Sequence, residues 1–263
     1  MGFIALLSDL GHYDTGVAKT KSILLQQLPA MQIIDVTHNI YPYYLQQAAY
    51  LLGSSFKDFP QGSFHIVLFD IYYDAQPKLV LAKIGESYIL APDNGVLPLA
   101  FPQKEMTTRL CYTMNDAGGL RAWVKAAADA IEILQNTPIE NTGFEPCEMQ
   151  NAAGQFKPFI TSGSMEGHVI HIDHFGNVVL NITKDEFEAT AAGRSFSVSF
   201  IREEVRTISN HYNSVNRFEK LCRFNSAGYM EIAINRGNAA ELFALKIKRP
   251  EQLMYTTIKI NFE

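Results

Sequence analysis

The first half of the chain alternates strand-like and helix-like segments, and this alternation constrains the fold more than any other feature. The segments are apolar runs at residues 3–9, 31–36, 64–70, 78–84 and 87–91, and stretches of helical period at residues 15–28, 45–56 and 120–136. A buried strand reads as a continuous apolar run, whereas a helix repeats its apolar residues every three or four positions. The pattern therefore predicts an α/β layer structure, with a mixed or parallel sheet and flanking helices.

The second half has a different texture. Residues 137–167 contain Pro, Gly, Ser and Asn without a sustained period, which indicates an irregular connection. Short β-rich segments follow, at residues 168–173, 177–183, 195–201, 229–235, 242–248 and 255–262. Such segments predict a small sandwich or barrel. We expect an N-terminal α/β domain at residues 1–155 and a C-terminal β-barrel-like domain at residues 160–263.

Composition excludes some partners. The 263 residues include 27 acidic and 22 basic side chains, and no Lys/Arg-rich run gives an electrostatic footprint for nucleic acid or an anionic membrane. The apolar start at residues 3–7 is too short to span a bilayer and has no basic segment before it. Cys111, Cys147 and Cys222 are odd in number and widely spaced. We therefore expect a cytoplasmic protein with reduced cysteines and no cysteine-based metal site.

Three strand-like runs of the first half each lead to an acidic residue, Asp9, Asp35 or Asp70. Ligands of open α/β sheets bind beyond the carboxyl ends of the strands, where carboxylates can meet a ribose, an amine or a metal. The alternative is that these residues cap the next helix or form Asx-turns.

Histidines near these runs leave a metal-dependent hydrolase open. His38 lies three residues after Asp35, and the chain adds His12 and His65. No HxH or HExxH pattern accompanies them, and a histidine near a strand end more often bonds the backbone than a metal.

Two bends in the second half combine aromatic, amide and glycine residues. One holds Asp173, Phe175, Gly176 and Asn177; the other spans residues 224–240 and holds Ser226 and Asn235. A ring that stacks and amides that pair with edge nitrogens are what a flat heterocycle needs. Ordinary β-bends of Asn and Gly have the same composition.

Six segments in this order resemble the S-adenosyl-L-methionine hydroxide adenosyltransferase family, relatives of the fluorinating and chlorinating enzymes. They are "LLSDLGHYDTGVAKTK", "IIDVTHNIYP", "FPQGSFHIVLFD", "APDNGVL", "HIDHFGNVVLNIT" and "NSAGYMEIAINRGNAA". The resemblance implies an N-terminal α/β domain, a C-terminal β-barrel-like domain and a homotrimer. It also implies ligand sites between the N-terminal domain of one subunit and the C-terminal domain of the next, and no cofactor. Family members displace methionine from C5′ of the adenosyl group with water or halide.

The resemblance also assigns site residues. Asp9 would hold the ribose hydroxyls, and Asp173 and Ser226 would meet the methionine end. The residues that would frame the site and the adenine are Phe175, Asn177, Asn235 and Arg236.

The catalytic group of water-using members is an Asp, an Arg and a His. Asp70 matches the carboxylate, but Pro77 stands at the arginine position, with Lys78 as the neighbouring cation. Gly119 falls at the histidine position, and Arg121 matches an arginine of the same motif. Lysine does not replace a planar guanidinium, and glycine cannot position a proton.

Three functions stay open. The first is hydrolysis of S-adenosyl-L-methionine to adenosine and methionine, with Asp70 and Lys78, or His12, at the reacting centre. The second is a protein that binds adenosine or S-adenosyl-L-methionine with little or no catalysis. The third, outside the family, is the metal-dependent hydrolase. Halide use is disfavoured because the N-terminal half shows no extra loop.

Overall fold

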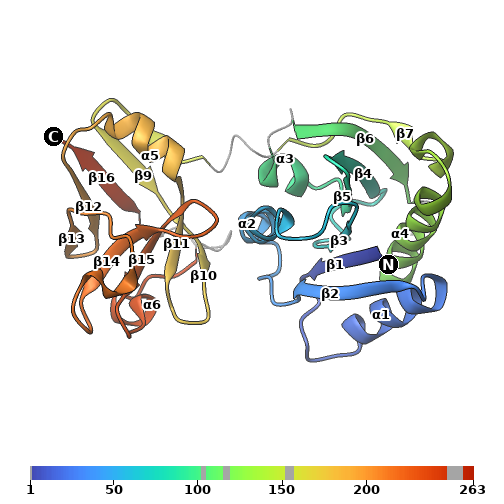
Figure 1. Cartoon of the computed structure of the whole chain (residues 1–263), viewed down its shortest axis with the longest axis horizontal. Helices are drawn as coiled ribbons and strands as arrows, with labels where there is room; N and C mark the ends of the chain where they lie inside the picture. Colours follow the sequence, from blue (N-terminus) through green and yellow to red (C-terminus); the bar gives the residue numbers. More distant parts are fainter. Residues whose placement is uncertain (1, 102–104, 115–118, 152–156, 248–256) are drawn as a thin grey trace. The chain divides into compact units, whose positions relative to one another are not determined.

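A computed structural model describes residues 2–101, 105–114, 119–151, 157–247 and 257–263 of the chain. The chain divides into two compact units, Met1–Ala153 and Gly154–Glu263 (Figure 1). Each unit has its own sheets, so the two are described separately.

The first unit is built on a seven-stranded mixed sheet in the order β2-β1-β3-β5-β4-β6-β7. The parallel strands are β2 (Met31–Thr37), β1 (Gly2–Ser8), β3 (Phe64–Leu68) and β5 (Ser87–Pro92). The antiparallel strands that extend this sheet are β4 (Lys78–Ile84), β6 (Met106–Thr113) and β7 (Glu145–Pro146). The α/β class predicted from the sequence is confirmed.

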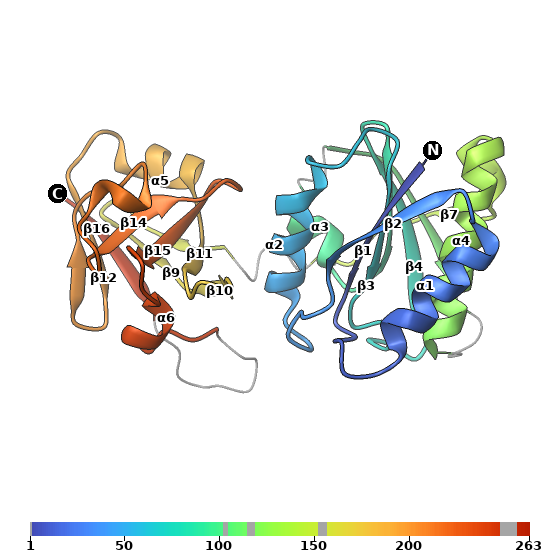
Figure 2. The same cartoon turned by 60° about the horizontal axis from the view of Figure 1, so that its bottom comes forward.

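Helices cover both faces of this sheet (Figure 2). On one face α1 (Gly16–Gln27) and α4 (Gly119–Asn136) pack on Ile4, Leu6 and other strand residues. On the other face α2 (Leu45–Phe56) and α3 (Val96–Ala100) pack on the alternate residues, such as Leu7. Because both faces are buried, the strands read as continuous apolar runs rather than alternating ones. A 3-10 helix, Ile139–Thr142, follows α4.

The second unit contains two antiparallel sheets. The four-stranded sheet has the order β10 (Val169–Ile172), β11 (Val178–Thr183), β15 (Tyr229–Ile234), β14 (Lys220–Phe224). The five-stranded sheet has the order β13 (Glu203–Val205), β12 (Phe196–Phe200), β16 (Ile258–Phe262), β9 (Ser164–Gly167), β8 (Phe159–Ile160). The remaining elements are α5 (Lys184–Ala191), the 3-10 helix Tyr212–Ser214 and α6 (Ala239–Leu242).

The expectation of a barrel needs correction. Among the described residues neither sheet closes on itself, since each order ends in strands that pair on one side. Both edge strands of the five-stranded sheet are very short, β13 with three residues and β8 with two. Strands of that length offer few backbone groups for pairing with another edge.

Several elements differ from the sequence-based pattern. Strands β6, β13 and β14 were not predicted, and β7, β8 and β9 lie in the stretch predicted to be irregular. Residues 242–247 contain no strand. Leu242 ends α6, which Asn238 caps at its start by accepting a hydrogen bond from the Glu241 amide, and a turn and irregular backbone follow at residues 243–247. Residue 248 lies outside the described part of the chain, as do residues 255 and 256 of the last predicted strand. Helix α5 was not predicted, although Thr183 and Glu186 form a capping box at its start.

Cys111 and Cys147 form a disulfide, so the expectation of reduced cysteines is wrong for this pair. The residues are 36 apart in sequence, but the pairing of β6 with β7 places Glu145 beside Cys111. Cys222 is a buried free thiol. In the parts of the chain that the structure describes, no helix has the length and apolarity needed to cross a membrane.

Candidate functional site

The second unit contains a pocket of about 580 Å³, a size suited to a small organic ligand. Its walls come from the bend between β10 and β11, the 3-10 helix Tyr212–Ser214 and the turn after β15. The residues that line it are Asp173, Phe175, Asn177, Tyr212, Asn213, Ile234, Asn235, Arg236 and Gly237. Five of the ligand residues suggested by the resemblance therefore lie around one cavity.

Asp173 organises the bend between β10 and β11. Its Oδ1 accepts hydrogen bonds from the amides of Phe175 (2.9 Å) and Asn177 (2.8 Å), and its Oδ2 accepts one from Asn177 Nδ2 (2.9 Å). The bond from the Phe175 amide, two residues on, forms an Asx-turn. Asp173 thus lines the pocket and holds this part of its wall in shape.

Gly176 presents the Phe175 ring at the rim of the pocket. Its φ is +79°, and a Cβ there would lie 2.0 Å from Asn238 Oδ1, so only glycine fits. Asn238 in turn caps α6, and the Ala240 amide donates to the Gly176 carbonyl (2.9 Å). Phe175 is 73% exposed, which leaves the ring face open for stacking.

Tyr212 is a pocket residue that the sequence analysis missed. Its Oη donates to Glu231 Oε1 (2.8 Å) and lies 3.5 Å from Asn177 Nδ2. The guanidinium of Arg223 stands 4.5 Å from the centre of the tyrosine ring. Burial and the Glu231 carboxylate raise the pKa of Tyr212 to about 12, so the phenol stays neutral.

The position of Glu231 is the one feature of the sequence that could have indicated the hydrogen bond with Tyr212. Glu231 is buried at 3% exposure in the middle of the apolar strand β15, and burial raises its pKa while the Tyr212 hydroxyl opposes that shift. A carboxylate inside an apolar strand needs a hydrogen-bond donor. Its position predicts a donor nearby but does not say which residue supplies it.

A tight turn after β15 completes the pocket. Asn235 Nδ2 donates to the Val215 carbonyl (2.9 Å), and the Asn235 carbonyl accepts from the Phe218 amide (2.8 Å). Arg236 has a φ of +59°, and Gly237 closes the turn on the Ile234 carbonyl (3.1 Å). The turn places backbone polar groups at the cavity wall.

Ser226 does not line this pocket. It is exposed in the turn that precedes β15, whereas Asn235 follows the end of that strand. The two residues suggested for the methionine end, Asp173 and Ser226, are thus not brought together within the second unit.

In the first unit, Asp9 and Asp70 follow the neighbouring parallel strands β1 and β3. Asp9 Oδ2 accepts a hydrogen bond from the Asp70 amide (3.0 Å). Burial raises the pKa of Asp9, with a smaller contribution from the charge of Asp70, and burial also raises the pKa of Asp70. Asp70 has a φ of +46°, which is uncommon for a residue with a side chain. Two close carboxyl groups with raised pKa values mark a candidate site.

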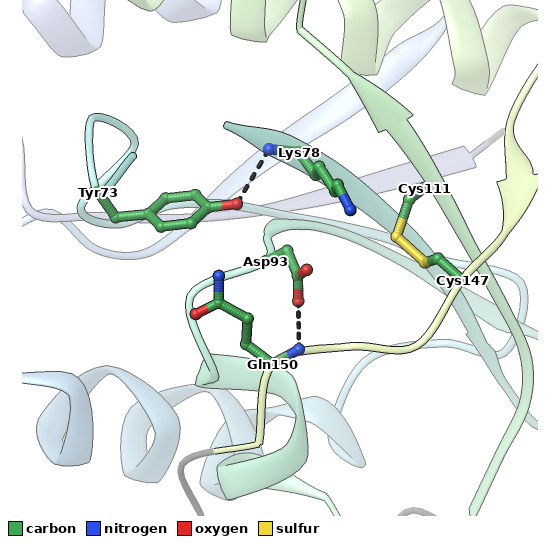
Figure 3. The surroundings of a disulfide bond; sticks show 6 residues. All are labelled: Tyr73, Lys78, Asp93, Cys111, Cys147 and Gln150. Carbon is green, nitrogen blue, oxygen red and sulfur yellow. Dashed lines mark hydrogen bonds between the residues drawn. A yellow bond between two sulfur atoms is a disulfide. The ribbon is translucent and has the colours of Figure 1, made fainter. Parts of the chain in front are cut away.

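Lys78 lies at the same edge of the sheet, where the carboxyl ends of β1, β3 and β5 are. It begins β4, which runs antiparallel to β5, so its neighbours are the residues at the end of β5. The Lys78 amide donates to Tyr73 Oη (2.9 Å), and the Lys78 charge favours ionised Asp93 (Figure 3). Pro77 is buried, and its carbonyl accepts from the Met114 amide (2.9 Å).

Gly119 lies at the start of α4 with a φ of +67°. A Cβ at this position would be 3.2 Å from the hydroxyl of Tyr72. Tyr72 belongs to the segment between β3 and β4, residues 70–78, which we call the Asp70 loop. It therefore borders the place where the resembling enzymes have a histidine. Arg121, in the first turn of the helix, is exposed.

Asp35 and the histidines do not form a metal site. Asp35 lies within β2, not beyond its end, and contacts Lys21 Nζ (2.5 Å) and His38 Nε2 (3.1 Å). His38 is fully buried, its Nδ1 lies 2.6 Å from Ser8 Oγ, and burial lowers its pKa. His12 contacts His38 edge to face, with ring centres 5.1 Å apart. Within the described ranges, no three His, Cys, Asp or Glu side chains converge.

His65 belongs to the core rather than to the sheet edge. It is 1% exposed near the start of β3, its Nε2 lies 2.9 Å from Ser63 Oγ, and its ring packs on Phe56. Burial lowers its pKa to about 4, so the ring is neutral at neutral pH.

Comparisons with known proteins give the same family for both halves of the chain. Models of the SAM hydroxide adenosyltransferase N-terminal and C-terminal domains match residues 4–133 and 167–252. A Thermus thermophilus protein named (R)-S-adenosyl-L-methionine hydrolase is 26% identical, over 95% of this chain and 99% of its own. A fluorinase of Actinopolyspora mzabensis is 23% identical, over 92% of this chain and 94% of its own.

A solved structure shows the same fold. The crystal structure of an uncharacterized conserved protein from Thermotoga maritima aligns with a TM-score of 0.76 at 24% identity, over 98% of this chain and 99% of that one. Because the two family models together cover most of the residues, the chain belongs to the S-adenosyl-L-methionine hydroxide adenosyltransferase family.

Proposed function

We propose that this protein hydrolyses S-adenosyl-L-methionine to adenosine and methionine by attack of water at C5′. The observation that carries the proposal is the Asp9–Asp70 pair, two carboxyl groups with raised pKa values at the carboxyl ends of neighbouring strands. The hydrolase name of the Thermus thermophilus relative supports the same reaction. A carboxylate with a raised pKa is the stronger base for water, and the sulfonium is a good leaving group without any cofactor.

The step needs few groups. The water oxygen forms a bond to C5′ while the C5′–S bond breaks, and methionine leaves as a neutral thioether. The water proton passes to the Asp70 carboxylate and from there to solvent. Asp9 would accept hydrogen bonds from the ribose hydroxyls, and Lys78 or His12 would steady the negative charge on the attacking oxygen. Alignment of the water behind C5′ accounts for most of the acceleration.

The pocket of the second unit would take the adenosyl group. Phe175 offers an exposed ring face, and the neutral Tyr212 ring forms another part of the wall. Asn177 Nδ2 is held by Asp173, so its Oδ1 can accept a hydrogen bond from an exocyclic amine of the base. The turn at Asn235 and Arg236 would frame the base edge. Ser226 would meet methionine from outside this pocket.

A binding protein without turnover is the second candidate. The observation that favours it is the pair of departures at Pro77 and Gly119, where water-using relatives have an arginine and a histidine. Such a protein would keep the residues that bind the ligand but lack the arginine and the histidine that assist the carboxylate of Asp70.

Incubation with S-adenosyl-L-methionine separates these functions. Release of adenosine and methionine in equal amounts, measured by chromatography, would support hydrolysis. Calorimetric binding of adenosine without product would support the binding protein instead. Turnover abolished by a chelator and restored by a divalent cation would contradict both and favour the metal-dependent hydrolase.

We also propose that the protein forms a homotrimer in which the two halves of the site come from neighbouring subunits. Light scattering should then give three times the 29.5 kDa mass of the chain. A monomer that releases adenosine at full rate would contradict this assembly.

A further inference from the structure

The Cys111–Cys147 disulfide lies beside a hydrogen-bonded chain that leads to the Asp70 loop (Figure 3). Cys111 is 8% exposed on β6, opposite Val80 of β4. Cys147 follows β7 and is half-buried. The bond therefore fixes the segment at residues 145–150 to the antiparallel edge of the first sheet.

The segment 145–150 reaches Asp93. The Gln150 amide donates to Asp93 Oδ1 (2.8 Å), and Asp93 is only 5% exposed. Burial disfavours the Asp93 carboxylate, whereas the Gln150 hydrogen bond and the Lys78 charge favour it. A buried carboxylate that loses a donor must gain a proton or rearrange. The position of Gln150 thus determines whether Asp93 is stable where it lies.

Asp93 and its neighbour Asn94 hold both ends of the Asp70 loop. Asn94 Nδ2 donates to the carbonyl of Phe69, the residue before Asp70 (2.9 Å). The Asp93 amide donates to the carbonyl of Lys78, at the end of the loop (3.0 Å). Asp70 has left-handed backbone angles, which persist in a non-glycine residue only where the surroundings hold them.

The other attachments of the segment are modest. Strand β7 has two residues, and the Cys147 amide lies 3.5 Å from the Arg109 carbonyl. Met149 is partly buried against the core under α2 and α3. The disulfide is the covalent contribution to this attachment, so its loss removes the strongest restraint on residues 147–150.

We propose that the Cys111–Cys147 disulfide is a redox-sensitive clamp that holds the Asp70 loop through Gln150, Asp93 and Asn94. The oxidised form keeps the loop in place, and the reduced form releases residues 147–150 and loosens it. The effect on turnover rests on the proposed function; the effect on loop order does not.

The reduction balances with a dithiol reductant. One of its thiolates attacks Sγ of Cys147, the more exposed residue of the pair, and displaces the Cys111 thiolate. The second thiol of the reductant then releases Cys147. Two electrons and two protons pass to the protein, and the reductant becomes a disulfide.

Hydrogen exchange of the whole chain tests the clamp. Protein oxidised with glutathione disulfide and protein reduced with dithiothreitol are compared by mass spectrometry, after the thiols are counted by alkylation. Reduction should speed exchange in peptides covering residues 70–78 and 93–97 by about fivefold or more, while peptides of β11 stay unchanged. The Cys147→Ala variant is the matched control: it should exchange like the reduced protein with or without dithiothreitol.

The outcomes are distinct. Failure of the pair to oxidise, or equal exchange of residues 70–78 in both forms, would overturn the clamp. With S-adenosyl-L-methionine, adenosine release should be at least about threefold slower in the reduced protein, and Cys147→Ala should not respond to dithiothreitol. Equal rates would overturn the link to turnover. No adenosine from either form would contradict the proposed function alone, because the exchange result decides the clamp by itself.

Discussion

The pocket of the second unit and the sheet edge of the first unit, where β1 and β3 lead to Asp9 and Asp70, keep their shape through different kinds of contact. In the pocket, side chains bond to one another: Asp173 to Asn177, and Tyr212 to the buried Glu231. At the sheet edge, the Asp70 loop is held mainly through its backbone, by Asn94 and Asp93. Side chains that bond to one another stabilise the shape of the pocket directly. The conformation of a loop that is held by neighbouring segments depends on whether those segments stay in place. We infer that binding is the more robust of the two properties and that reaction is the more easily changed.

The largest expected effect separates reaction from binding. Asp70→Asn should lower adenosine release by about a thousandfold, because the amide cannot accept the water proton. Adenosine affinity, measured by calorimetry, should change little. The matched control is Asp74→Asn, an exposed carboxylate of the same loop, which should keep the rate. Full activity of the Asp70 variant would show that the sheet edge does not carry the reaction.

Lowering the pH should decrease the free energy of unfolding of the first unit, because His65 is buried in its neutral form. Its pKa is about 4 in the folded chain against 6.5 for the free side chain, so the unfolded state binds the proton first. This contribution to stability is complete above pH 6.5 and declines as the pH falls toward 4, by up to about 3 kcal/mol. Urea unfolding at several pH values should show a shallower decline for His65→Gln than for the wild type. Identical pH slopes would contradict the buried neutral imidazole.

Tyr212→Ala tests the pocket. Loss of the ring from the wall should weaken adenosine binding by about thirtyfold, within the range of one stacking contact. Phe159→Ala, an exposed ring of β8, should leave the affinity unchanged. Tyr212→Phe keeps the ring but leaves Glu231 without its donor, so it should lower the free energy of unfolding by about 1–2 kcal/mol. An unchanged affinity of the alanine variant would remove Tyr212 from the site.

The smallest expected effect concerns the support of the Asp70 loop. Asn94→Ala removes the hydrogen bond to the Phe69 carbonyl and the longer one from the Val96 amide (3.2 Å), and it should slow adenosine release about fivefold. Adenosine affinity should stay constant. Asn136→Ala, which removes a bond at the exposed end of α4, is the control. A loss of affinity equal to the loss of rate would mean that the two regions are not separable in this way.

Prediction from sequence succeeded where the signal was local. Strands β1 to β5 and helices α1, α2 and α4 follow from apolar runs and helical periods, whereas β6, β7 and α3 were not predicted. The bend at Asp173 follows from its turn residues, and its place in a pocket was expected from the ring of Phe175 and the amide of Asn177. The strand expected at residues 242–248 was wrong because Phe243 and Leu245 are buried without being in a strand, so an apolar pattern reports burial and not its geometry.

By itself, the sequence determined the α/β class, the first five strands and three main helices of the first unit, the family resemblance and most residues of the pocket. Only the tertiary structure decided which distant residues meet. It joined Tyr212 to Glu231, Cys111 to Cys147 and Gln150 to Asp93, and it left both antiparallel sheets of the second unit open. The physical reason is that period and turn chemistry act between near neighbours, whereas these contacts depend on strand order and register.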